Sequence, residues 1–297
     1  MTTSKPRKMH ADQAEIDDAL VRRLVEGQFP QWAGLPVRHV DSPGTVNALY
    51  RLGEELVVRL PLRTGSDDEI ATEFAWLPRL AAQLPVPIPE PLAQGAPAGH
   101  IAWSWSVYRW LDGTPPVIGE LTDPRELAAD LAGFITALRR VDTTGAPRCS
   151  RGGPLAPRDE ATRKALAQLD GVIDTAAAAA VWEKALAAPA YDGPDRWMHG
   201  DLQPGNLLLR DGRLAAVIDF GLVGVGDPTV DLITAWYVLP AEARADFRAA
   251  VGADEATWVR GRGLALSIAL LELSYYRETN PRMASTARHV IAEILAA

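Results

Sequence analysis

The spacing of hydrophobic residues in the first third of the chain is typical of strands. Apolar and polar residues alternate over residues 48–52 and 56–60, on either side of Gly53-Glu54-Glu55. A period of two indicates half-buried strands, and the short glycine-containing connection favours a hairpin. Further strands are predicted at residues 37–40 and 103–111.

Two helices are predicted within the same third. Residues 12–29 carry apolar side chains at helical spacing, and residues 67–83 follow Ser66, a predicted N-cap with Glu69 at the third helical position. Prolines then recur at every second position from 85 to 91, which predicts an extended connector.

The pattern changes after residues 112–116, a turn-rich segment that we interpret as a hinge. Asp123, Pro124 and Glu126 have the order of an N-cap, a first-turn proline and a capping-box residue. Helical spacing then dominates, and the predicted helices are 123–141, two within 159–188, 231–239, 241–251, 255–277 and 281–295. The chain is therefore predicted to be α+β, with a small β-rich lobe at 1–111 and a larger helical lobe at 112–297.

One segment carries polar residues in the order that phosphoryl transfer requires. Asp201 and Asn206 follow His199-Gly200, and Asp219 follows in Ile218-Asp219-Phe220-Gly221. An aspartate can accept or orient the proton of an attacking hydroxyl, while an asparagine and a second aspartate can hold Mg²⁺ against a triphosphate.

The residues between these side chains predict a hairpin. Asp211-Gly212 separates two apolar runs, and this pair favours a type I′ turn with positive φ at both positions. Asn206 would enter the first strand and Asp219 would leave the second, so both reach the same end of the hairpin. Oxygen ligands of this kind suit Mg²⁺. Taken singly, each residue could instead serve as a turn or cap residue.

Composition narrows the range of partners and compartments. The net charge of −8 argues against nucleic acid as a partner, because phosphate binding requires a basic surface. The single cysteine, Cys149, excludes an internal disulfide. The polar, basic first ten residues lack the apolar core of a secretory signal, and the longest apolar stretch is too short to span a bilayer. We therefore expect a cytoplasmic protein without membrane association and without an obligate protein partner.

The motif resembles that of the aminoglycoside phosphotransferase family of kinase-like enzymes. The resemblance rests on His199-Gly200-Asp201 with Asn206, on Ile218-Asp219-Phe220-Gly221, and on Asp227-Pro228 with Asp231-Leu232. Residues 47–52, 56–61 and 106–113 resemble the family's first hairpin, phosphate-binding strand and hinge. The resemblance implies a bilobal protein-kinase-like fold with ATP or GTP bound in the cleft together with Mg²⁺.

The resemblance also implies a role for each matching residue. Asp201 would be the catalytic aspartate, braced by His199, which could equally be a core histidine. Asn206 and Asp219 would bind Mg²⁺, and Asp231 would hold the loop structurally. Residues that would contact the nucleotide are Ser42, Gly44, Thr45, Arg59, Glu73, Arg109, Trp110 and Leu111.

Arg59 departs from the family pattern. It stands where the family has a lysine that pairs with the helical glutamate, here Glu73. A guanidinium is always charged and can contact two phosphate oxygens, so the replacement is chemically sound. The alternative is an arginine at a strand edge with no role in nucleotide binding.

The acceptor is expected to be a small cationic antibiotic, most readily an aminoglycoside. Together with Asp201, the predicted substrate-binding residues are Glu272, Tyr275, Tyr276 and Glu278. Carboxylates beside aromatic rings suit an ammonium-bearing ligand. The same residues could instead be core tyrosines and solvated glutamates. A kinase for a sugar or an amino alcohol is the alternative function, and a non-catalytic nucleotide-binding module is a third.

Overall fold

The structure is a computed structural model that describes residues 14–41, 46–65, 67–99 and 101–296. Its internal contacts divide these residues into two compact units. The first contains the described residues up to Pro78 together with Pro89–Trp110, and the second contains Arg79–Ile88 and the described residues from Leu111 onwards. The two units are described separately below.

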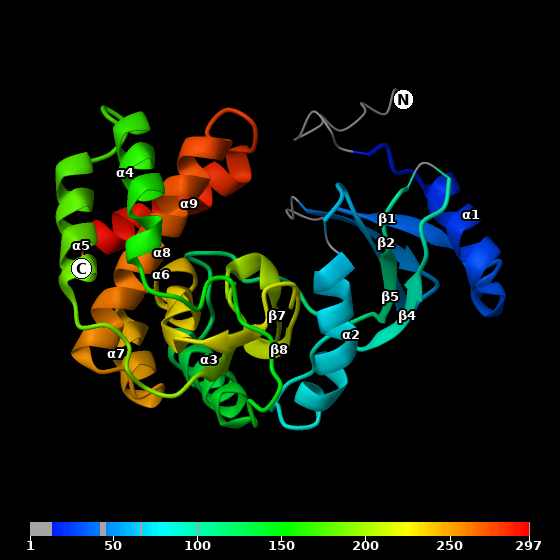
Figure 1. Cartoon of the computed structure of the whole chain (residues 1–297), viewed down its shortest axis with the longest axis horizontal. Coiled ribbons are helices and arrows are strands. Elements are labelled where there is room, and N and C mark those ends of the chain that lie inside the picture. Colours follow the sequence, from blue (N-terminus) through cyan, green and yellow to red (C-terminus); the bar gives the residue numbers. More distant parts are fainter. Residues whose placement is uncertain (1–13, 42–45, 66, 100, 297) are drawn as a thin grey trace. The chain divides into compact units, whose positions relative to one another are not determined.

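The first unit is built on a five-stranded antiparallel sheet (Figure 1). The strand order is β1-β2-β3-β5-β4. The strands are β1 (Val37–Val40), β2 (Asn47–Leu52), β3 (Leu56–Pro61), β4 (Pro91–Gly95) and β5 (Trp105–Arg109). The predicted hairpin is confirmed, since Leu52 pairs with Leu56 around Gly53. Alternate residues of β2 are buried, as the period of two requires.

Strand β4 was missed by the sequence analysis, which predicted an extended connector at this point. It lies at the edge of the sheet, and its pairing with β5 shifts register between Pro91 and Ala93. Proline has no N–H to donate to a neighbouring strand, so an edge strand is where a sheet tolerates it. The proline-rich composition was therefore compatible with a strand that has only one partner.

The first helix, α1 (Asp18–Gln28), begins later than predicted. The Asp17 side chain accepts a hydrogen bond from the Leu20 N–H (2.7 Å) and caps the helix. Upstream residues bond to the sheet region instead, because the Ala14 N–H donates to the Leu62 carbonyl and the Tyr50 hydroxyl donates to the Ile16 carbonyl. These bonds hold residues 14–16 outside the helix.

Helix α2 (Asp67–Ala81) ends two residues before its predicted end and contains Pro78. Its predicted cap, Ser66, lies outside the described residues. The division between the two units falls inside this helix, since Pro78 belongs to the first unit and Arg79 to the second.

The second unit is mainly helical. Its helices are α3 (Pro124–Arg140), α4 (Asp159–Gln168), α5 (Thr175–Ala187), α6 (Thr234–Tyr237), α7 (Ala241–Ala250), α8 (Glu255–Tyr276) and α9 (Pro281–Leu295). The predicted N-cap of α3 is confirmed, because Asp123 accepts a hydrogen bond from the Glu126 N–H (3.1 Å).

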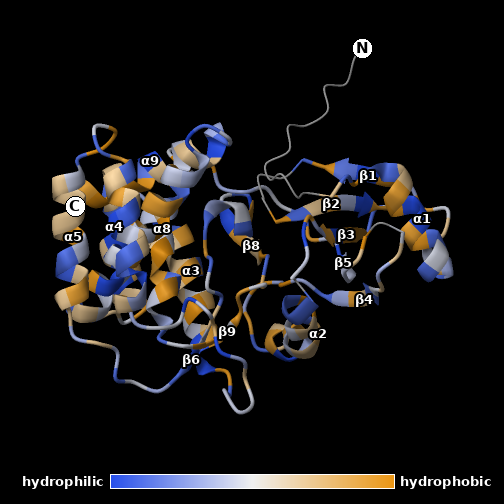
Figure 2. Ribbon diagram, turned by 45° about the horizontal axis from the view of Figure 1, so that its top comes forward, coloured by the Kyte–Doolittle hydropathy of each residue, from blue (hydrophilic) through white to orange (hydrophobic). Residues whose placement is uncertain are grey.

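Helix α8 forms the centre of this unit and packs against α5, α9 and α4. Apolar residues run along much of its length (Figure 2), and Leu264, Leu266 and Leu270 are among those fully buried. Its burial confirms the prediction of a core helix over the longest apolar stretch. Among the described residues, no helix is both long and apolar enough to cross a membrane.

Two small antiparallel ribbons carry the catalytic motif. Strand β6 (Arg196–Met198) pairs with β9 (Gly224–Gly226), and β7 (Leu207–Arg210) pairs with β8 (Arg213–Val217). The predicted turn of the second ribbon is confirmed, because Asp211 and Gly212 both have positive φ, 53° and 77°. The β6–β9 ribbon was not predicted, since each of its strands spans only three residues.

Candidate active site

The catalytic loop starts directly after β6, whose residues Trp197 and Met198 are fully buried. Gly200 adopts a φ of 87°, a left-handed conformation that favours glycine. A Cβ at this position would lie 3.0 Å from the Leu222 side chain and 3.1 Å from Cys149 Sγ. The loop is therefore closely packed at its first turn, against a thiol whose pKa burial raises to about 11.

Asp231 anchors this turn from the 3₁₀ helix Pro228–Ile233. Its Oδ2 accepts a hydrogen bond from the His199 N–H (3.0 Å), and its Oδ1 accepts one from the Gly200 N–H (2.9 Å). The carboxylate is fully buried, and burial raises its pKa against the effect of these donors. One side chain thus satisfies two successive backbone groups that water cannot reach.

His199 links the two halves of the motif. Its Nδ1 accepts a hydrogen bond from the Asp201 N–H (3.1 Å), so Nε2 carries the proton and donates to the Ile218 carbonyl (3.0 Å). The ring is fully buried and packs edge-on against Phe220, with centroids 4.6 Å apart. Its contact is with the backbone N–H of Asp201, so the histidine braces the loop through the main chain.

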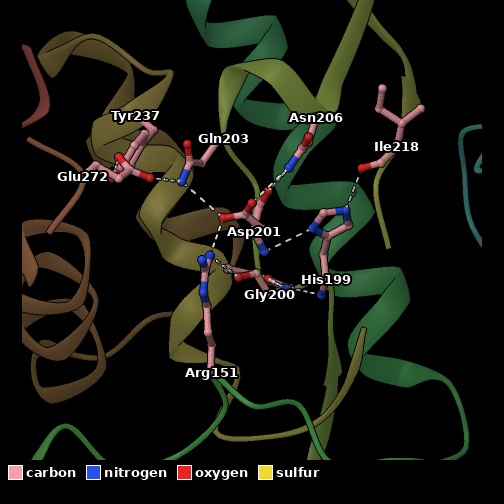
Figure 3. A network of polar contacts seen from close by, with 10 residues as sticks. Arg151, His199, Gly200, Asp201, Gln203, Asn206, Ile218, Tyr237 and Glu272 are labelled. Atoms are coloured by element: carbon pink, nitrogen blue, oxygen red, sulfur yellow. Dashed lines mark hydrogen bonds and ion pairs between the residues drawn. The ribbon is translucent and has the colours of Figure 1, made fainter. Parts of the chain in front are cut away.

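The Asp201 carboxylate is held by three side chains (Figure 3). Its Oδ1 forms an ion pair with Arg151 and accepts a hydrogen bond from Gln203 Nε2 (3.2 Å). Its Oδ2 accepts a hydrogen bond from Asn206 Nδ2 (3.2 Å). About a quarter of the Asp201 side chain remains exposed. The carboxylate is thus fixed in direction and still reachable from solvent.

Asn206 and Asp219 meet at the base of the β7–β8 hairpin, as predicted from the turn. The Ile218 N–H donates to the Asn206 carbonyl (2.9 Å), which places the residue before Asp219 beside Asn206. Asp219 has a φ of 64°, a conformation uncommon outside glycine and concentrated at functional sites.

These two residues fit a magnesium ion. The Asn206 amide turns its nitrogen toward Asp201, which leaves its oxygen as the atom that can face a cation. A carboxylate and an amide oxygen are ligands that Mg²⁺ accepts alongside phosphate oxygens and water. Within the described part of the chain, no group of three or more His, Cys, Asp and Glu side chains could hold a metal alone. A metal held by Asn206 and Asp219 would keep further coordination positions for phosphate oxygens and water.

Arg59 on β3 forms a buried ion pair with Glu73 on α2 (Nη1–Oε1, 2.7 Å). Glu73 is fully buried and also accepts a hydrogen bond from the Tyr108 hydroxyl, whose pKa is raised mainly by burial. When the Asn47 amide is oriented with its oxygen toward Arg59, that oxygen accepts hydrogen bonds from Arg59 Nε (2.9 Å) and Nη2 (3.1 Å). This environment differs from that of an exposed strand-edge arginine.

The other predicted nucleotide-binding residues have varied positions. Ser42, Gly44 and Thr45 lie outside the described residues. Arg109 is half exposed and pairs with Glu90 (2.6 Å).

Trp110 directly follows β5. The Arg51 guanidinium lies over the Trp110 ring, with its central carbon 4.0 Å from the ring centroid. The backbone N–H of Trp110 donates a hydrogen bond to the Glu55 carbonyl (2.7 Å). Leu111 is half-buried and is the residue at which the second unit resumes.

Glu272 on α8, one of the predicted substrate-binding residues, contacts two side chains of the protein. Its Oε1 accepts a hydrogen bond from Gln203 Nε2 (2.8 Å), and its Oε2 accepts one from the Tyr237 hydroxyl (2.9 Å). Burial raises the pKa of Glu272. The residue lies near Asp201, as expected for the acceptor side, but its oxygens already bind protein groups.

The remaining predicted acceptor residues lie further along α8 and beyond its end. Tyr275 is 57% exposed, which excludes a core position, and its ring packs edge-on against Tyr276 with centroids 4.8 Å apart. Glu278 is 80% exposed and pairs with Arg277 (3.1 Å). Glu272 and these three residues therefore do not form one uniform surface.

Arg151, Gln203 and Tyr237 were not predicted from the sequence. Gln203 lies inside the motif, so its position was a signal that could have been used. Arg151 lies in the segment between α3 and α4, where no site residue was predicted, and Tyr237 lies in α6. Nothing in the local pattern around these two residues indicates their contacts with the site.

Several solved structures of phosphotransferases are similar to this chain. APH(2")-IIIa in complex with GDP and kanamycin has 20% identity and a TM-score of 0.74, with 93% of this chain and 98% of that chain covered. The macrolide 2'-phosphotransferase MphH from Brachybacterium faecium has 22% identity and a TM-score of 0.62, with 94% and 97% covered. At these identities the likeness shows a shared fold, which confirms the predicted α+β, kinase-like class.

Comparison with models of protein families shows more than a shared fold. No curated protein matched the chain. The model of the phosphotransferase enzyme family, by contrast, matches residues 40–264, which include β3, α2, the catalytic loop and the first part of α8. This match spans most of the chain and contains Arg151, Gln203 and Asn206, the three residues that hold the Asp201 carboxylate. The resemblance found in the sequence is therefore confirmed, and the chain belongs to the phosphotransferase enzyme family.

Proposed function

We propose that this phosphotransferase moves the γ-phosphoryl group of ATP or GTP to a hydroxyl of a small cationic antibiotic, most readily an aminoglycoside. The observation that carries the proposal is the setting of Asp201. Its carboxylate is fixed by Arg151, Gln203 and Asn206, yet it remains partly exposed. Positioned carboxylates of this kind orient or deprotonate an attacking hydroxyl.

The transfer step follows from this geometry. The acceptor hydroxyl donates its hydrogen bond to Asp201, and its oxygen forms a bond to the γ-phosphorus as the bond to the nucleoside diphosphate breaks. The proton passes to the Asp201 carboxylate. Asn206 and Asp219 would hold Mg²⁺, which offsets phosphate charge when it is bound. Asp231 and His199 keep the loop in place through backbone contacts.

Nucleotide binding is proposed for the first unit. Arg59 keeps a fixed orientation through Glu73, so its guanidinium can present N–H groups to phosphate oxygens. Ser42, Gly44 and Thr45 would contact the phosphates through backbone and hydroxyl groups. We further propose that residues 109–111 contact the rest of the nucleotide.

The antibiotic class is supported by the similar structures. One of them holds GDP and kanamycin, and another, the streptomycin–ATP complex of APH(2")-IIa, has 16% identity and a TM-score of 0.61, with 96% of this chain and 97% of that chain covered. Exposed Tyr275 and Glu278 offer an aromatic face and a carboxylate for an ammonium group. A negative net charge of −8 also favours cationic ligands.

A small hydroxylated metabolite is the second candidate acceptor. The observation in its favour is that Asp201 and Glu272 both have cationic or hydrogen-bonding partners within the protein. Two carboxylates that are already paired attract a polycation less than two open ones would. A sugar or amino alcohol would need fewer charged contacts.

A nucleotide-consumption screen tests the proposal. Purified protein would be given ATP or GTP with Mg²⁺ and a panel of aminoglycosides, macrolides, other cationic antibiotics, choline and sugars. We expect the fastest acceptor-dependent turnover with an aminoglycoside. Turnover confined to choline or sugars would replace the antibiotic by a metabolite, and the absence of turnover with any hydroxylated acceptor would contradict the proposed reaction.

A further inference from the structure

Arg151 is the cation nearest the catalytic carboxylate, and it lies outside the motif. Its Nη1 contacts Asp201 Oδ1 and donates to the Gly200 carbonyl (3.2 Å). Only about a quarter of each side chain is exposed, 27% for Arg151 and 24% for Asp201. A sheltered, charge-assisted contact of this kind is stronger than an ion pair in open solvent.

The backbone that carries Arg151 is fixed on both sides. The Cys149 N–H donates to the Val225 carbonyl (3.1 Å), and the Asp227 N–H donates to the Gly152 carbonyl (3.0 Å). A Cβ at Gly226 would collide with the Gly152 carbonyl, so the two segments approach closely. Arg151 therefore extends toward Asp201 from a rigid support.

The two carboxylate oxygens of Asp201 differ in how many further hydrogen bonds they can accept. Oδ1 accepts from both Arg151 and Gln203, and Gln203 is itself tied to Glu272. Oδ2 accepts from Asn206. Because a carboxylate oxygen accepts about two hydrogen bonds, the remaining capacity lies on Oδ2.

We propose that Arg151 is a positioning residue for phosphoryl transfer. Its guanidinium holds Oδ1 so that Oδ2 faces the acceptor hydroxyl and receives its proton. The inference rests on the proposed function, because it requires Asp201 to act on that hydroxyl. Arg151 acts through Asp201 and needs no contact with the acceptor or the phosphates.

A double-mutant cycle tests this dependence. Arg151→Met should lower kcat by about 10²-fold with little change in nucleotide KM, as expected when a reacting group is misplaced. Arg151→Lys should recover part of the loss, and added guanidinium ions should partly restore Arg151→Ala. In an Asp201→Ala background, Arg151→Met should change the residual rate less than about two-fold, since no carboxylate remains to be positioned.

Arg148→Met is the matched control. Arg148 lies three positions earlier in the same segment and pairs with exposed Asp195, so its loss should leave kcat near wild type. If Arg151→Met lowers the melting temperature, the same cycle is measured with Arg151→Lys, which retains the charge.

The outcomes separate the inference from the proposed function. Near wild-type turnover in Asp201→Ala would overturn the proposed function, and with it the need for positioning. Loss of activity in Asp201→Ala with unchanged kcat in the Arg151 variants would overturn the inference alone. Equal losses from Arg151→Met in both backgrounds would also overturn it, because Arg151 would then contact the phosphates or the acceptor directly.

Discussion

Asp231 is a fully buried carboxylate and Glu272 a partly buried one, and their partners near the catalytic loop differ. Asp231 accepts hydrogen bonds from two backbone N–H groups, whereas Glu272 accepts them from the Gln203 amide and the Tyr237 hydroxyl. Burial raises the pKa of each. The first residue therefore fixes the backbone of the loop, and the second fixes a side chain that contacts Asp201.

Asp231→Asn should destabilise the protein. The substitution replaces one acceptor oxygen by an NH₂ group that would face a backbone N–H, and an unsatisfied buried donor costs roughly 1–3 kcal/mol. Urea unfolding measures this change, and kcat should fall with it because the loop carrying Asp201 shifts. Asp195→Asn, at an exposed ion pair, is the control and should stay within about 0.5 kcal/mol of wild type. Equal stability of wild type and Asp231→Asn would show that the two hydrogen bonds contribute nothing.

Glu272→Gln should change how stability depends on pH. Because the folded-state pKa of Glu272 is raised, its stabilising contribution is complete below the unfolded pKa and is lost as pH rises through the folded pKa. The unfolding free energy of wild type relative to Glu272→Gln should therefore decrease from about pH 4 toward neutrality. Urea titrations across this range measure the difference. A difference that rises with pH would contradict the raised pKa.

The placement of the motif residues could be predicted from sequence because it depends on local spacing. His199, Asp201 and Asn206 lie within eight positions of one another, and a single turn returns the chain to Asp219. Arg151 could not be identified, since its contact with Asp201 depends on backbone pairing between distant segments. The hydrogen bonds of Glu272 to Gln203 and Tyr237 could not be predicted either. Helical spacing predicts which residues share a face of a helix, but not which residues pack against that face.

At the scale of elements, the strongest predictions rested on turns and caps. The hairpins around Gly53 and around Asp211-Gly212 and the start of α3 at Asp123 follow directly from local chemistry. Elements that depend on tertiary pairing were missed, as with the edge strand β4 and the three-residue strands β6 and β9. Apolar spacing also placed the start of α1 too early, because it carries no information on the hydrogen bonds that hold residues 14–16 to the sheet region.

The β7–β8 hairpin carries both proposed metal ligands, so its turn should affect stability and nucleotide binding together. Gly212 has a φ of 77°, and an alanine there would cost about 1–2 kcal/mol. Gly212→Ala should lower the unfolding free energy by this amount and weaken Mg²⁺-nucleotide binding measured by calorimetry.

Gly133 provides the matched control for this substitution. It lies inside α3 with a helical conformation and no atom within 4 Å of an added Cβ. Gly133→Ala should therefore stabilise the protein by roughly 0.5–1 kcal/mol and leave nucleotide binding unchanged. A neutral or stabilising effect of Gly212→Ala would contradict the positive-φ turn.

At the scale of the whole molecule, acidic residues outnumber basic ones and give a net charge of −8. The excess is larger in residues 112–297, the segment that carries the catalytic loop. If the acceptor is cationic, its KM should rise as salt is added, because screening weakens exposed charge pairs over about 10 Å at 0.1 M ionic strength. Initial rates at several salt concentrations measure this dependence. A salt-independent KM for the best acceptor would favour the metabolite over the antibiotic.

We propose that the Asp201 carboxylate acts on the acceptor hydroxyl, and the turnover of Asp201→Ala tests this role. The measurement compares kcat of wild type and variant with the best acceptor, alongside nucleotide affinity from calorimetry. We expect kcat to fall by roughly 10²–10⁴-fold while nucleotide affinity stays within a few-fold of wild type, because the carboxylate contributes to the transition state and not to nucleotide binding. Near wild-type turnover by Asp201→Ala would contradict the claim.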